Sequence, residues 1–243
     1  MTTFGSAGGS ILRGIGPGSI RPTARNQGAQ GLYKLYWARN SGALGPQILL
    51  EEAGIPHEIV PVDFRVGDNK KPEYLAINPI GYIPSLECAD GSIVYEAAAI
   101  MMFLAEEQGL DGLVPPPGHE RRGLFLRSLF FMSGTIQYLY HIFYNPDRYS
   151  PDPADAPKLK DQALASLRER WSLVDAQLRD NGPYMLGDAD SMLDIYMLML
   201  VTWFPPRDSL LTANPALRKC FELTAARPVV HKLLIEHEIA ESA

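Results

Sequence analysis

The strongest constraint on the fold is a change of hydrophobic pattern at the proline triplet 115–117. Before it, short segments rich in aromatic and β-branched residues alternate with helical patterns. After it, every patterned segment has apolar residues three to four positions apart, as in amphipathic helices. Consecutive prolines break helices and stiffen the chain. The sequence therefore predicts a small α/β domain, a stiff linker and an all-helical domain.

The expected elements follow the order β-α-β-α-β-β-α before the linker. Pro46 fits the first turn of the first helix, and Gly54 is a helix stop. The expected strands are 32–37, 57–62, 85–88 and 92–95, and the expected helices are 43–53, 73–77 and 96–108. After the linker, helical segments are expected at 120–144, 158–179, 191–204, 215–226 and 228–239.

Charge and composition exclude several classes of protein. A formal net charge of -6 and an isoelectric point near 5.4 argue against a nucleic-acid binder. No apolar run approaches the ~20 residues of a membrane span. The two cysteines, Cys88 and Cys220, suit neither a disulfide framework nor a zinc site. We expect a cytoplasmic protein without a metal site or a membrane or nucleic-acid partner.

Residues 1–31 differ from the rest of the chain. They contain eight glycines and three arginines, and the first acidic residue is Glu51. Such a segment has too few apolar residues to build a core, so it is expected to be a flexible tail. A cleaved targeting peptide is the alternative, since transit peptides are rich in arginine and poor in acidic residues.

Three motifs carry a resemblance to a known family. They are NPIGYIPSL at 78–86, YEAAAI at 95–100 and YMLGDADSMLD at 184–194. In this order and at these distances, they are similar to the N-P-x-G-x-[VI]-P-x-L, E-[SG]-x-A-I and Y-L-x-G-x-x-x-S-x-A-D segments of cytosolic glutathione transferases. The chain resembles this family over about 32–243. Its active-site loop is somewhat like those of Nu-class and bacterial beta-etherase relatives.

The resemblance implies the architecture and the co-substrate. A thioredoxin-like, glutathione-binding α/β domain is expected over 32–112 and an all-α domain over 119–243. Glutathione would be the co-substrate, and a homodimer is expected from the family alone. Ser191 and Asp194 would form the cap of a central helix, with no catalytic role.

The resemblance also places the glutathione-binding residues. It implies a cis peptide bond between Ile83 and Pro84, which would turn the Ile83 backbone outward to pair with the extended tripeptide. Tyr82 stands where relatives carry a Lys, Gln or His that reaches the glycyl carboxylate. The start of a helix at Glu96 and Ala97 would hold the γ-glutamyl group. A plain turn proline and a simple first-turn charge are the alternatives for Pro84 and Glu96.

The group that would stabilise the thiolate is the main departure from the family. Gly42 and Ala43 stand where relatives carry Cys, Asn or Ser, and neither has a side-chain donor. We expect Asn40 or Ser41 to approach the sulfur, or the backbone N–H groups of Gly42 and Ala43 to replace them. Capping of the following helix is the other role open to Asn40 and Ser41.

The electrophile pocket is expected between the two domains. Phe131, Thr135 and Tyr138 recur at helical spacing on the first long helix after the linker, and His141 lies on a neighbouring stripe. If they line the cleft, the substrate is apolar and aromatic. Packing in the core, and a hydrogen-bonded structural role for His141, are the alternatives.

The function implied is a glutathione-dependent transferase or lyase. The thiolate would attack an apolar electrophile and form a thioether. Because the loop lacks a Cys or Ser at the family's positions, a catalytically silent ligand-binding or scaffold protein is one alternative. A glutathione-dependent disulfide reductase is another.

Overall fold

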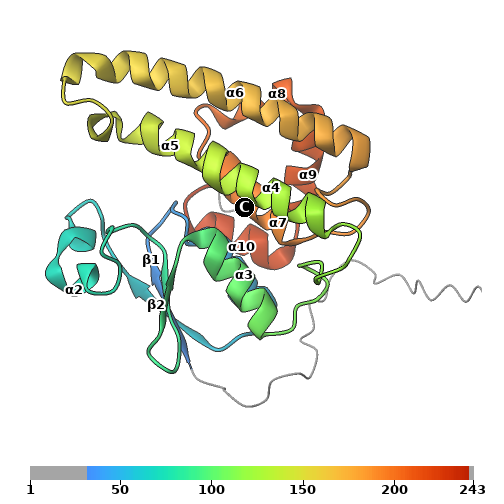
Figure 1. Cartoon of the computed structure of the whole chain (residues 1–243), viewed down its shortest axis with the longest axis horizontal. Helices are drawn as coiled ribbons and strands as arrows, with labels where there is room; N and C mark the ends of the chain where they lie inside the picture. The colour runs from blue at the N-terminus through green and yellow to red at the C-terminus, as the bar shows by residue number, and fades with distance from the viewer. Residues whose placement is uncertain (1–31, 241–243) are drawn as a thin grey trace, which may run out of the picture.

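The computed structural model describes residues 32–240, so the tail predicted over 1–31 lies outside the described residues (Figure 1). One mixed four-stranded sheet has the order β2-β1-β3-β4. β1 is parallel to β2, and β3 is antiparallel to both β1 and β4. The strands are β1 (Tyr33–Trp37), β2 (His57–Pro61), β3 (Ser85–Glu87) and β4 (Ile93–Tyr95).

Two helices, α1 (Leu44–Glu52) and α3 (Ala97–Glu107), pack against each other beside the sheet. A 3₁₀ turn at Asp68–Lys70 and the short α2 (Pro72–Leu75) connect β2 to β3. The small core between sheet and helices contains Leu35, Leu50, Leu86, Ile100 and Leu104, all fully buried. The predicted β-α-β-α-β-β-α order and the thioredoxin-like fold class are therefore confirmed.

The remainder of the described chain is helical, as predicted (Figure 1). Its helices are α4 (Arg122–Phe131), α5 (Gln137–Tyr144), α6 (Ala156–Asn181), α7 (Met192–Thr202), α8 (Arg207–Ala213), α9 (Pro215–Ala225) and α10 (Pro228–Glu236). Every α7 residue except the last, Thr202, is buried, which explains why α7 is apolar on all sides. None of the helices within 32–240 is long and apolar enough to cross a membrane.

Two details of the helical part differ from the sequence predictions. The segment predicted as one helix over 120–144 contains a π-helical turn at Met132–Ile136 between α4 and α5. The short α8 was not predicted at all, because its polar first turn gives little apolar periodicity. A π turn adds a residue to a helical turn and so changes which side chains share a face.

The predicted cap of α7 is present. Ser191 Oγ accepts the Leu193 N–H at 3.2 Å, and the Asp194 carboxylate accepts the Ser191 N–H at 2.7 Å. Asp194 is fully buried and also accepts the Met185 N–H at 2.7 Å. The pair therefore joins the loop before α7 to the helix itself.

The last helix, α10, returns to the first domain and packs against α1. Figure 1 shows α10 at the level where the two parts of the chain meet. Lys232 pairs with Glu51 at 2.9 Å, and Arg227 pairs with Glu52. These ion pairs fix α10 beside α1, the helix that follows the β1–α1 loop.

Candidate functional site

Three segments of the first domain converge at Gly42, in the loop between β1 and α1. A Cβ added to Gly42 would lie 2.9 Å from Pro84 Cδ, 3.2 Å from the Ile83 carbonyl oxygen and 3.6 Å from Ala97 Cβ. The loop backbone therefore lies directly against the Ile83-Pro84 segment and the start of α3. This close approach explains why position 42 carries no side chain, and hence no side-chain donor.

The Ile83–Pro84 peptide bond is cis, as the family resemblance implied. The preceding residue is held firmly, because the Tyr82 carbonyl accepts hydrogen bonds from Tyr74 Oη at 2.6 Å and Asn78 Nδ2 at 2.9 Å. Within residues 32–240, the Ile83 N–H and C=O form no hydrogen bond. Ile83 therefore offers one backbone donor and one acceptor to an extended peptide.

The start of α3 lies beside this segment. Glu96 is exposed and has a positive φ of 74°, a conformation that non-glycine residues rarely adopt. The first turn of α3 begins at Ala97 and has no side-chain cap. Its N–H groups and the positive end of the helix dipole are suited to a carboxylate. Glu96 provides a negative charge next to them for a ligand ammonium group.

The two predicted thiolate donors differ in availability. The Ser41 hydroxyl donates to the Ala38 carbonyl at 2.7 Å and accepts the Ala43 N–H at 3.2 Å, so it serves its own loop. Asn40 is exposed, and its side chain forms no hydrogen bond with the described residues. Of the two, Asn40 therefore has the free side-chain donor.

A cavity of about 330 Å³ opens beside Asn40. It is lined by Asn40, Thr202, Pro206, Arg207, Asp208, Glu238 and Ile239. These residues come from the site loop, the end of α7, the start of α8 and the segment after α10. Its walls include the charged residues Arg207, Asp208 and Glu238, whereas the sequence predicted a pocket lined by aromatic side chains.

Tyr82 and His141, predicted for different subsites, lie together between the two parts of the chain. Their rings stack with centroids 5.0 Å apart and an interplanar angle of 12°. Arg148 Nη1 donates to Tyr82 Oη at 2.9 Å, and its guanidinium lies 5.3 Å from the Tyr82 ring. Burial, and then the Arg148 charge, lower the pKa of His141, so the imidazole is neutral at pH 7.

Sequence reasoning missed Arg148. It belongs to a 3₁₀ turn at Pro146–Arg148 after α5, where no periodicity or motif distinguishes it from an ordinary surface charge. Its contact with Tyr82 joins residues 66 positions apart. Only the folded chain brings this cation to the Ile83 segment.

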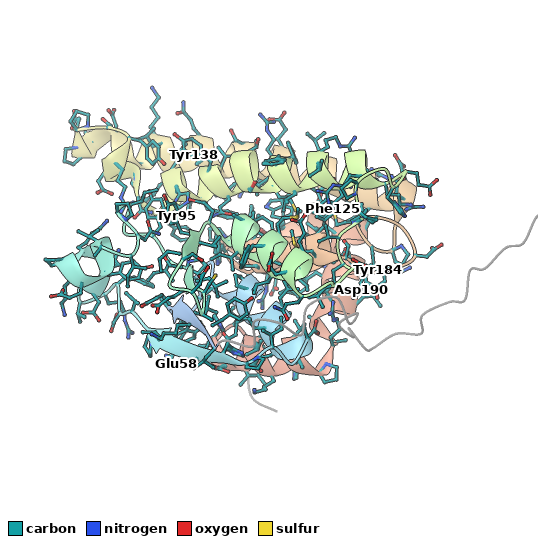
Figure 2. All side chains as sticks on the ribbon, turned by 60° about the horizontal axis from the view of Figure 1, so that its bottom comes forward. Glu58, Tyr95, Phe125, Tyr138, Tyr184 and Asp190 are labelled. Carbon is teal, nitrogen blue, oxygen red and sulfur yellow. The ribbon has the colours of Figure 1, made fainter. Side chains whose placement is uncertain are left out.

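The other predicted pocket residues do not form one wall. Tyr138 meets Tyr149 edge-on at 5.7 Å, and burial and then the Tyr138 hydroxyl raise the pKa of Tyr149 to about 12. Phe131 lines a separate groove between α4 and α6, while Thr135 lies half-buried in the π turn. In Figure 2, Tyr138 of α5 lies well away from Phe125 of α4, the helix that precedes it.

Comparison with known proteins identifies the family. Residues 43–107 match the family model described as "Glutathione S-transferase, N-terminal domain". Glutathione S-transferase 3 of Zea mays is 30% identical over 193 residues, which cover 76% of this chain and 84% of the relative. The uncharacterized GST-like protein YncG of Escherichia coli is 26% identical, covering 72% of this chain and 83% of the relative.

Solved structures show the same fold. A glutathione transferase from Methylococcus capsulatus superposes with a TM-score of 0.74 at 30% identity, covering 86% of this chain and all of the other. A glutathione transferase homologue from Sulfitobacter, crystallised with bound glutathione, has a TM-score of 0.78 at 24% identity. It covers 84% of this chain and 98% of the other. The fold, the three motifs and these similarities show that the chain belongs to the glutathione transferase family.

Proposed function

We propose that the chain binds glutathione across Ile83 and activates its thiol for transfer to an electrophile. The observation that carries the proposal is the packing of Gly42 against Ile83, Pro84 and Ala97. It places the free backbone groups of Ile83, the open N-terminus of α3 and the β1–α1 loop around one point. Glutathione is an extended peptide with a carboxylate at each end, which suits this combination.

The ends of glutathione are assigned by charge. The γ-glutamyl carboxylate lies at the first turn of α3, and its ammonium group faces Glu96. The glycyl carboxylate lies toward Tyr82, where the Arg148 guanidinium supplies the positive charge that Tyr82 itself lacks. The cysteinyl backbone pairs with Ile83, which directs the sulfur toward the β1–α1 loop.

Thiol activation is assigned to that loop. A free thiol with a pKa near 8.5 is only a few per cent ionised at pH 7, and hydrogen-bond donors lower its pKa. The Asn40 amide and the Gly42 N–H, which takes part in no hydrogen bond within 32–240, are the donors proposed here. Ser41 contributes by holding the loop rather than by touching the sulfur.

The electrophile is assigned to the space between Asn40 and the helical domain. The thiolate attacks an electrophilic carbon, a carbon–sulfur bond forms, and the leaving group departs or a proton is added. An apolar, aromatic electrophile is proposed to contact Tyr138 and His141, and its polar substituents are proposed to extend into the cavity beside Asn40.

The test is a calorimetric titration with glutathione, followed by ultraviolet absorbance of the thiolate. The proposal expects binding and a thiol pKa well below 8.5. Absence of binding at millimolar glutathione would refute it. Asn40→Ala and Ser41→Ala then separate the thiol donor from the residue that holds the loop: the first raises the thiol pKa, and the second mainly lowers stability.

A ligand-binding protein without turnover is the second candidate. It is favoured by the Ser41 hydroxyl, whose hydrogen is already donated to the Ala38 carbonyl. In that case glutathione binds while its thiol keeps a pKa near 8.5. No thioether would then form from epoxides, aryl halides or β-aryl ethers.

Domain bounds, oligomeric state and location complete the proposal. Residues 32–112 and 119–243 are proposed as the glutathione-binding and helical domains. A homodimer in the cytoplasm is proposed on the basis of family membership. Sedimentation equilibrium tests the dimer, and fractionation of cells tests the location.

A further inference from the structure

A histidine outside the glutathione-binding elements is bonded directly to the site loop. His237 follows the last residue of α10 and is fully buried. Its Nδ1 lies 3.1 Å from the Asn40 backbone nitrogen, and its Nε2 lies 2.9 Å from Gln47 Oε1. One imidazole ring therefore joins the segment after α10 to both the β1–α1 loop and α1.

The hydrogen bonds determine the protonation state of this ring. A backbone N–H can only donate, so His237 Nδ1 accepts from Asn40 and carries no proton. The neutral ring therefore carries its hydrogen on Nε2 and donates to Gln47 Oε1. Trp37 Nε1 lies 2.8 Å from the same Gln47 oxygen and 3.0 Å from His237 Nε2. Because the Asn40 bond leaves the hydrogen on Nε2, the Trp37 N–H donates to the Gln47 oxygen, and the Trp37 ring meets the imidazole edge-on.

The orientation of Gln47 is determined as well. Its Nε2 donates to Glu51 at 3.2 Å and to Glu236 at 3.3 Å, which leaves its oxygen for Trp37 and His237. Gln47 is itself buried. Every polar atom of this buried group has a partner, an arrangement that favours the tautomer in which His237 Nδ1 accepts from Asn40.

The backbone that His237 holds has an unusual conformation. Asn40 has a φ of 48°, in the left-handed region, which few non-glycine residues adopt and asparagine adopts more readily than most. Residues in such conformations persist when the surrounding structure holds them. Because the Asn40 N–H is bonded to this ring, residue 237 fixes the Asn40 backbone and hence the point from which the Asn40 side chain extends beside the cavity.

We infer that His237 is a positioning residue for thiol activation: by accepting the Asn40 N–H, it holds the β1–α1 loop so that its donors reach the sulfur of glutathione. The inference rests on the proposed function. His237 touches neither glutathione nor the electrophile, and it acts through Asn40 alone. Its effect is therefore on the thiol pKa rather than on glutathione affinity.

Two substitutions separate the two bonds of the ring. In His237→Asn, the side-chain oxygen can take the place of Nδ1 and accept the Asn40 N–H, while the bond to Gln47 is lost. In His237→Gln, the longer side chain can reach Gln47 in place of Nε2, while the acceptor for Asn40 is lost. Each variant is compared with the wild type by its glutathione Kd and by the thiolate absorbance against pH.

The inference expects His237→Asn to keep the wild-type thiol pKa and His237→Gln to raise it, with at least fivefold less thiolate at pH 7. Both variants should bind glutathione within about threefold of the wild type. Equal thiol pKa values in the two variants, whether unchanged or raised together, would overturn it.

A measurement on the unsubstituted chain covers the case in which neither variant folds. Hydrogen exchange of the Asn40 amide reports the bond to His237 directly. A protected amide supports the inference, and exchange at the rate of an unfolded chain overturns it. If the wild type does not bind glutathione, the proposed function fails, whereas the exchange result still shows whether His237 holds the loop.

Discussion

Replacing Gly42 with alanine tests whether contact between the site loop and the Ile83-Pro84 segment is necessary for glutathione binding. The added Cβ would lie 2.9 Å from Pro84 Cδ, whereas carbon atoms in contact are about 3.5–4.0 Å apart. One of the two segments must therefore move by roughly 0.6–1.1 Å. Neither atom belongs to the end of a flexible side chain, so the backbone itself has to shift.

The expected cost in stability is modest, while the cost in function is large. Overpacking of this kind costs about 1–3 kcal/mol. The loss of glycine's freedom in the unfolded chain offsets about 0.4–1 kcal/mol of it. Displacement of a positioned group by 1 Å can lower catalysis by about 10²-fold. The free energy of unfolding of Gly42→Ala, measured in urea, should therefore be only about 1–2 kcal/mol lower than that of the wild type. The variant should nevertheless form much less glutathione thiolate than the wild type.

Gly123→Ala is the matched control. Gly123 lies in α4, and a Cβ there would meet no atom within 4 Å. Because alanine has a higher helix propensity than glycine, this variant should be up to about 1 kcal/mol more stable than the wild type, with unchanged glutathione binding. If Gly42→Ala bound and ionised glutathione like the wild type, the convergence of segments at Gly42 would not be the glutathione site.

Three further predictions follow from single contacts. Arg148→Ala should weaken glutathione binding about tenfold but leave binding of the glycyl ethyl ester unchanged, and equal losses in calorimetry would contradict the assignment of the glycyl carboxylate. Asp194→Ala should lower the free energy of unfolding by about 3 kcal/mol, because several buried donors lose their acceptor; a loss below about 1 kcal/mol in urea would contradict this. Burial and then Arg39 lower the pKa of His237 to about 4, below its value of about 6.5 in an unfolded chain. Its contribution, about 3 kcal/mol, is therefore complete above pH 6.5 and lost as pH falls through 4; in urea unfolding, the free energy of the wild type should fall by this amount relative to that of His237→Asn between pH 6.5 and 4, and a pH-independent difference would contradict it.

Local patterns explain how much of the fold could be predicted. Alternating apolar residues, Gly54 as a stop and the Asp90-Gly91 turn are signals within a few residues of one another, and the elements they predict are present. The cap formed by Ser191 and Asp194 is equally local. The short α8 was missed because it buries only Leu210 and Leu211, too few for a helical period.

The candidate site could be predicted only in part, because its decisive contacts are long-range. Ile83, Pro84 and Glu96 belong to a continuous stretch with a recognisable motif, so their positions could be expected. Arg148 contacts Tyr82 across 66 positions of the sequence. His237 contacts Asn40 across 197 positions. No local pattern marks either residue, and each resembles an ordinary polar surface residue in the sequence.

The attachment of α10 to α1 also has a consequence for the order of events during synthesis. A ribosome makes the β1–α1 loop early and His237 almost 200 residues later. Domains generally begin to fold as they emerge, so the sheet and its helices can form while the helical part is still being made. The Asn40 N–H, however, has no acceptor until residue 237 has left the ribosome. With the site and the role of His237 as proposed, a nascent chain exposes its glutathione-binding surface before the loop is set, and thiol activation begins only when α10 docks.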